Sequence, residues 1–157
     1  MTAQYSLAQE GKYLTFALGP EDYGLEILKV REIIGIMSIT TVPQVPAYVK
    51  GVINLRGKVI PVIDLRLKFG MPSIEVTAET CIIIVNLQEV LIGIMIDKVK
   101  EVLDIKQDKI EPAPNFGANV LTDYILGIGK VNDTVKILLN IERILGEDAT
   151  YADQVKE

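Results

Sequence analysis

Short apolar runs, separated by glycine, proline and polar turn residues, recur along most of the chain. Tyr13–Leu18 alternates in polarity, and Tyr23–Ile27 forms a second run after the turn sequence Gly19–Asp22. Alternation with a period of two is typical of a half-buried β-strand. The apolar residues are mostly Ile, Val and Leu, which favours strands over long helices. We therefore expect an all-β protein with short helices.

A β-hairpin is predicted in the middle of the chain, after a proline-bounded connection. Two apolar runs, Gly51–Leu55 and Val59–Leu65, flank the tip Asn54–Gly57. Runs bounded by Gly and Asn in this way are typical of a hairpin. A helix of one or two turns is predicted next, with Asp64 as its N-cap and Gly70 as its C′ residue.

The second half of the chain repeats the first in two ungapped blocks. Residues 24–33 align with 93–102 at a constant difference of 69, and residues 51–70 align with 127–146 at a difference of 76. The change in difference places an insertion near Lys106–Thr122. Matching glycines and caps indicate an internal duplication, although Ile- and Val-rich strands can also align with themselves by chance.

Each copy contains about five short strands, which suggests a small barrel. We expect a single domain over residues 12–146, with repeats at about 12–70 and 81–146, and flexible tails at 1–11 and 147–157. Barrels of this size bury little surface alone. They should therefore pack on each other or exchange strands.

The two copies differ at the hairpin tip. Arg56 aligns with Asn132, so folding of this hairpin does not require an arginine. Two interpretations stay open. Arg56 recognises a partner, or it pairs with a nearby acid such as Glu32 and holds the barrel together.

Composition excludes several classes of function. The chain has 157 residues and a net charge of -5, which disfavours nucleic-acid and anionic-membrane binding. It contains no histidine, which removes the common catalytic triads and most transition-metal sites, so no cofactor or metal is expected. Cys81 lies in an apolar run and is expected to be a small buried hydrophobe. The polar N-terminus lacks a signal-peptide pattern and no apolar run is long enough to span a membrane, so a cytoplasmic protein is expected.

The central segment of the sequence resembles the signature of a known family. Segment 46–70, which reads PAYVKGVINLRGKVIPVIDLRLKFG, is similar to the signature of the CheW family of bacterial chemotaxis coupling proteins. Residues 29–33 and 93–102 also fit the family, and the resemblance covers about residues 12–146. Because no kinase or receiver sequence accompanies the domain here, a stand-alone adaptor is the expected type.

The resemblance implies two SH3-like five-stranded barrels and a non-catalytic adaptor. Such an adaptor links the cytoplasmic tip of methyl-accepting chemoreceptors to the regulatory domain of the histidine kinase CheA, within membrane-associated receptor arrays. In the family, the groove between the barrels receives the receptor. The resemblance assigns receptor coupling to positions that match Val30, Glu32, Gly51 and Arg56, with Asn54, Leu55 and Gly57 as motif neighbours.

Three alternatives are left open by the sequence. The chain could serve another kinase pathway, such as one for surface sensing, with the same fold. It could be an enzyme that uses Asp97 and Glu101, although lysines interleave these carboxylates. It could also tether one partner only.

Overall fold

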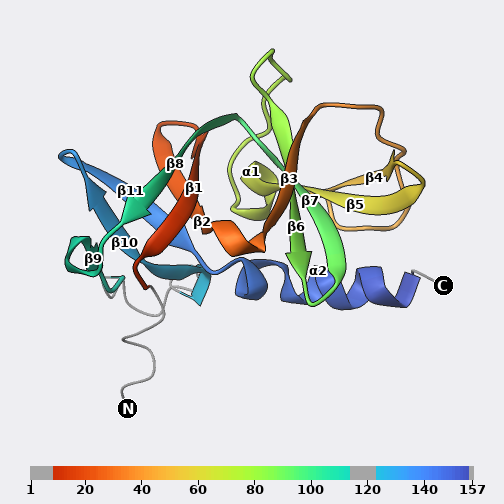
Figure 1. Cartoon of the computed structure of the whole chain (residues 1–157). Helices are drawn as coiled ribbons and strands as arrows, with labels where there is room; N and C mark the ends of the chain where they lie inside the picture. The colour runs from red at the N-terminus through yellow and green to blue at the C-terminus, as the bar shows by residue number, and fades with distance from the viewer. Residues whose placement is uncertain (1–8, 114–122, 156–157) are drawn as a thin grey trace. The chain divides into compact units, whose positions relative to one another are not determined.

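The chain folds into two compact units, each built on one mixed β-sheet (Figure 1). The computed structural model describes residues 9–113 and 123–155. The terminal unit comprises the described residues up to Leu28 together with Lys100–Gly146, and the central unit comprises Lys29–Val99 with the described residues from Glu147.

The terminal unit contains a six-stranded sheet in the order β8-β1-β2-β11-β10-β9. Its sixth strand, β9, is only two residues long. In β1 and β2, Phe16 pairs with Tyr23 across the antiparallel register, and their rings stack 5.8 Å apart. The strands are β1 Gly11–Leu18, β2 Glu21–Glu26, β8 Lys98–Ile105, β9 Ile110–Glu111, β10 Ile125–Val131 and β11 Thr134–Leu139.

The central unit contains a five-stranded sheet in the order β3-β6-β7-β5-β4. Its strands are β3 Val30–Gly35, β4 Val49–Leu55, β5 Lys58–Asp64, β6 Cys81–Leu87 and β7 Val90–Ile96. Across both units, the α-helices are α1 Leu65–Lys68 and α2 Ile141–Val155, and the short 3-10 helices include Ile27–Lys29 and Gln107–Lys109.

Strands from both halves of the sequence combine in each unit. In the terminal unit β2 runs parallel to β11, with Gly24 opposite Leu138, and in the central unit β7 runs parallel to β5, with Gly93 opposite Val62. These two pairs differ by the same 69 and 76 positions that relate the sequence blocks. The repeated register is therefore a structural counterpart of the repeat, and the halves exchange strands.

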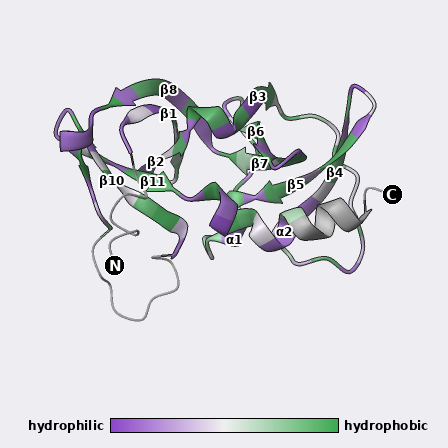
Figure 2. Ribbon diagram, turned by 60° about the horizontal axis from the view of Figure 1, so that its bottom comes forward, coloured by the Kyte–Doolittle hydropathy of each residue, from purple (hydrophilic) through white to green (hydrophobic). Residues whose placement is uncertain are grey.

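Among the described residues, the strands of each unit bury an apolar cluster, and the turns are mostly hydrophilic (Figure 2). In the described residues each strand order runs between two edge strands and does not close into a ring. The prediction of a mainly β protein with short helices is confirmed, and the two units are consistent with the expected pair of SH3-like barrels, although the terminal sheet has six strands and not five. The terminal cluster contains Tyr13, Ile105, Leu126 and Leu138, and the central cluster contains Ile53, Ile60, Val62, Ile82 and Ile84.

Both helices begin at polar caps. The Asp64 carboxylate accepts a hydrogen bond from the Leu67 N–H at 3.3 Å, and Gly70 follows α1 with a φ of 79°, as the sequence predicts. Asn140, at the equivalent position before α2, accepts a hydrogen bond from the Arg143 N–H at 3.2 Å. Helix α2 continues to Val155, through residues that the sequence assigned to a tail.

No helix in the described ranges combines the length and the apolar character that crossing a membrane requires.

Candidate interaction site on the β4–β5 hairpin

The hairpin ends in a tight two-residue turn. Leu55 and Lys58 form the last pair of β4 and β5, and Arg56 and Gly57 connect them. Their φ angles are 51° and 89°, so both residues adopt the left-handed backbone conformation. Two successive left-handed residues are characteristic of the type I′ turn, whose twist matches that of the flanking strands.

The Asn54 side chain closes the turn. Its Oδ1 atom accepts a hydrogen bond from the Gly57 N–H at 2.8 Å. Asx side chains often bond to nearby backbone in this way and stabilise turns. The direction in which Arg56 leaves the backbone is therefore set locally by the turn.

Arg56 extends from the tip to an acidic residue on β3. Its Nη2 atom pairs with Oε2 of Glu32, the partner that the sequence suggested. The Arg56 side chain is nevertheless 69% exposed and that of Glu32 is 30% exposed. Exposed pairs contribute about 0.2–1 kcal/mol to stability. The guanidinium has five N–H donors, so a single carboxylate oxygen leaves most of its bonding capacity for a partner.

Gly51 is required by the chain's own backbone. Its φ is 143°, and an added Cβ would lie 2.0 Å from the Thr40 carbonyl oxygen. The close approach arises because Thr40 and Val52 form an isolated antiparallel bridge with N–H···O distances of 2.8 and 2.9 Å. The family resemblance assigned this glycine to receptor coupling, and the structure supplies a reason for it within the chain's own fold.

The other predicted residues lie on β3 or on the β4–β5 hairpin. Val30 begins β3, is partly buried and pairs with Val85. Leu55 packs against the central apolar cluster. The structure therefore brings Glu32 and Arg56 into contact and joins Asn54 to the turn, whereas Leu55 belongs to the packing below.

The equivalent tip of the terminal unit has the same backbone and different chemistry. Asn132 and Asp133 have φ angles of 51° and 65°. Lys130, which aligns with Asn54, pairs with Glu111 at 2.5 Å. An arginine at the turn is thus a feature of one copy of the repeat.

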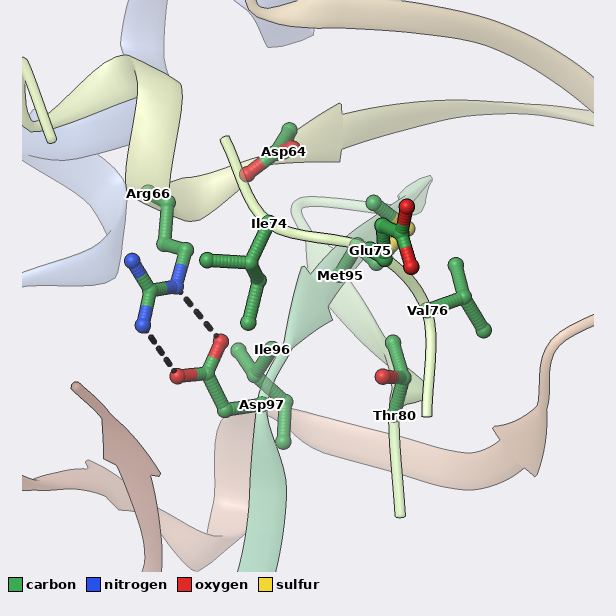
Figure 3. Close-up of a pocket in the computed structure, with 9 residues that line it drawn as sticks. All are labelled: Asp64, Arg66, Ile74, Glu75, Val76, Thr80, Met95, Ile96 and Asp97. Atoms are coloured by element: carbon green, nitrogen blue, oxygen red, sulfur yellow. Dashed lines mark hydrogen bonds and ion pairs between the residues drawn. The ribbon is translucent and has the colours of Figure 1, made fainter. Parts of the chain in front are cut away.

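Asp97, one of the two carboxylates considered for an enzyme, is held in an ion pair (Figure 3). Its oxygens accept hydrogen bonds from Nε and Nη2 of Arg66 at 2.8 and 2.7 Å, and both residues line a small pocket. Hydrogen bonding to Asp97 raises the pKa of Arg66. The carboxylate is engaged as a counterion, so this geometry gives no support to a role as a general base.

Sequence reasoning missed a second departure between the two copies. Lys68 lies 4.1 Å from the centre of the Tyr48 ring and 3.2 Å from Oδ2 of Asp148, while the Tyr48 hydroxyl donates to Oδ1 at 3.1 Å. Burial acts to lower the pKa of Lys68, but Tyr48 and Asp148 outweigh it and raise that pKa. Lys68 aligns with Ile144 in the repeat. This mismatch between the two copies is the sequence signal that could have pointed to the contact of Lys68 with Tyr48 and Asp148.

Comparison with known proteins places the chain in a family. The CheW-like domain family matches residues 12–149. A chemotaxis protein CheW from Klebsiella aerogenes is 39% identical over 145 residues, covering 92% of this chain and 87% of the relative. One from Helicobacter pylori is 40% identical over 137 residues, covering 87% and 82%.

A solved structure agrees with this assignment. The scaffolding protein TtCheW from Thermoanaerobacter tengcongensis matches with a TM-score of 0.77 and 37% identity, covering 84% of this chain and 90% of that one. The chain therefore belongs to the CheW-like domain family.

Proposed function

We propose that this protein is a non-catalytic chemotaxis adaptor that couples methyl-accepting chemoreceptors to the histidine kinase CheA. Three lines support the proposal: the family match over residues 12–149, relatives named as chemotaxis proteins, and a structural neighbour named as a scaffolding protein. In this role the chain acts in the cytoplasm, recruited to membrane-associated receptor arrays. It binds the receptor tip and the regulatory domain of CheA at once.

The observation that carries the receptor site is the exposed arginine on the β4–β5 turn. Arg56 is 69% exposed although it pairs with Glu32, and its counterpart in the other copy is Asn132. A charge that folding does not require, held on a tight turn beside an edge strand, is suited to recognition. A carboxylate on a receptor helix would share or replace Glu32 as its partner.

Apolar contact would supply the rest of the receptor affinity. Ile33 on β3 is 43% exposed and Val59 on β5 is 70% exposed. A receptor helical hairpin that lays an apolar stripe against β3 and the β4–β5 hairpin would cover surface of this kind, as helices do in other groove complexes. Val30, Glu32 and the backbone of the Gly51–Gly57 segment would lie within the receptor contact, and the Arg56 side chain would set its register.

The test is a co-purification of the chain with the CheA regulatory domain and a chemoreceptor tip fragment. Wild type should retain both partners together. Arg56→Ala should lower receptor affinity by about tenfold, the range expected for a charge-assisted hydrogen bond at an interface. It should leave CheA binding unchanged and shift the thermal midpoint little, because the ion pair with Glu32 is exposed.

The matched control is Asn132→Ala, at the same turn position of the other copy. It should leave receptor affinity at the wild-type value. Receptor binding by Arg56→Ala at wild-type affinity would remove Arg56 from the site, and retention of one partner at a time would contradict the adaptor role.

A further inference from the structure

Two-residue turns with successive left-handed residues occur at three hairpins in the described part of the chain. They connect β4 to β5, β6 to β7, and β10 to β11. A left-handed conformation is unfavourable for most L-residues because Cβ crowds the backbone, while Gly, Asn and Asp tolerate it best. The three pairs are Arg56 and Gly57, Gln88 and Glu89, and Asn132 and Asp133.

The three turns differ in how well their residues suit that conformation. In the β10–β11 turn both residues, Asn132 and Asp133, belong to the tolerant types. The β6–β7 turn has Gln88 and Glu89, and the β4–β5 turn has Arg56 at its first position. The last two turns therefore hold side chains that do not favour the conformation by themselves.

An asparagine two positions before the turn is present in those two turns. Asn54 Oδ1 accepts the Gly57 N–H at 2.8 Å, and Asn86 Oδ1 accepts the Glu89 N–H at 2.9 Å. The corresponding position of the third turn is Lys130, whose ammonium pairs with Glu111. The asparagine thus accompanies the turns whose residues need help to become left-handed.

The hydrogen bond to the asparagine matters most in the turn that holds Arg56, because the Arg56 side chain is 69% exposed and packing does little to fix it. The backbone at the turn decides where its Cα–Cβ bond points, and so whether the guanidinium lies against Glu32. We infer that Asn54 is a positioning residue for receptor recognition: it holds Arg56 in place through the Gly57 backbone and makes no receptor contact of its own. The inference rests on the function proposed above.

The experiment compares Asn54→Ala, Arg56→Ala and the double variant in the full chain. Affinity for a chemoreceptor tip fragment is measured by calorimetry, and the turn is followed by the intraresidue amide–Hα NOE of Arg56, which is strong for a left-handed residue. Asn54→Ala should weaken the NOE and lower affinity by about three- to tenfold, the effect of one net hydrogen bond. The double variant should bind no more weakly than Arg56→Ala alone, because both changes act through one side chain.

Two further variants separate positioning from general stability. Asn54→Asp keeps an acceptor for the Gly57 N–H and should restore the NOE and most of the affinity. Asn86→Ala removes the same hydrogen bond from the β6–β7 turn of the same unit. It should change the thermal midpoint as much as Asn54→Ala does, with receptor affinity unchanged.

Additive losses in the double variant would show that Asn54 contacts the receptor itself, and would overturn the inference. An unchanged NOE in Asn54→Ala would overturn it as well. If Arg56→Ala binds the receptor as wild type does, the proposed receptor role of Arg56 fails and the positioning role in recognition fails with it. In that case the NOE still reports whether Asn54 holds the turn.

Discussion

Gly51 and Arg56 lie on one hairpin, yet different requirements determine them. An added Cβ at Gly51 would meet the Thr40 carbonyl oxygen, so the backbone of the central unit demands glycine there. At the tip, the turn forms in the other copy with Asn132, so the backbone does not demand Arg56. Comparing the two copies separates a residue needed for folding from one that is free to serve recognition.

Gly51→Ala should therefore destabilise the protein. Its φ of 143° is unfavourable for alanine, and the Cβ would lie 2.0 Å from a backbone oxygen that cannot move without breaking the Thr40–Val52 bridge. We expect a loss of about 2–4 kcal/mol in the free energy of unfolding, measured by urea titration.

Gly35→Ala on β3 is the control, because an added Cβ there would meet nothing within 4 Å and the φ of Gly35 is not positive. It should leave the free energy of unfolding unchanged or slightly higher. Equal stability for the Gly51 and Gly35 variants would contradict the steric account. The same measurement shows why Gly51 variants cannot report on receptor binding alone.

At the scale of elements, local sequence signals predicted what local contacts determine. The N-cap Asp64 and the C′ residue Gly70 bound α1 as expected, because capping is decided within one helical turn. The ion pair of Glu32 with Arg56 was suggested as one of two possibilities. The extent of α2 was missed, since Asp148 is held by Tyr48 and Lys68, which lie 100 and 80 positions away.

Asp148→Ala should loosen the C-terminal part of α2 within the central unit. The side chains of Lys68 and Asp148 are only 9% and 12% exposed, so removing the carboxylate leaves a poorly hydrated ammonium beside Tyr48. Loss of a buried partner of this kind costs about 2–4 kcal/mol. Hydrogen exchange of residues 147–155 should become faster than in wild type.

Glu79→Ala is the matched control for this prediction. It breaks an ion pair with Lys98 in the same unit, in which the side chains are 61% and 50% exposed. Exchange at 147–155 should stay at the wild-type rate, because exposed pairs contribute little. If the Asp148 variant also exchanged at the wild-type rate, the three-residue contact would not be what holds this part of α2.

For the whole molecule, the sequence predicted the fold class and the duplication but not which strands share a sheet. Gly24 and Gly93 were matched across the repeat, yet only the structure shows that they lie opposite Leu138 and Val62 in two parallel pairs. Strand exchange depends on pairing between distant segments, which a linear pattern does not encode. The residues of the proposed receptor site were predicted from the family resemblance. The structure shows which of them contact one another: Arg56 with Glu32, and Asn54 with Gly57.

The response of the whole chain to acid should depend on a polar group in the terminal unit. Asp22 accepts from Lys136 at 2.6 Å and from Lys100 at 3.2 Å, and Lys136 is only 7% exposed. Burial acts to raise the pKa of Asp22, but hydrogen bonds and charge from the two lysines outweigh it, so the pKa is lowered from 3.8. A carboxylate with a lowered folded pKa stabilises the protein above its unfolded pKa, and this stability is lost as pH falls through the folded pKa.

Asp22→Asn should thus destabilise the protein at pH 7 by about 3 kcal/mol, because it leaves the buried Lys136 ammonium without a counter-charge. The difference from wild type should begin to shrink below about pH 4, where the carboxylate of the unfolded chain takes up a proton, and should shrink further as pH falls through the lowered pKa of the folded state. Urea unfolding at pH 7 and pH 3 measures both values. Asp104→Asn, at a carboxylate that is 50% exposed and 3.7 Å from Lys12, should have little effect at either pH. An Asp22→Asn deficit of the same size at both pH values would mean that lost packing, and not lost charge, explains the variant.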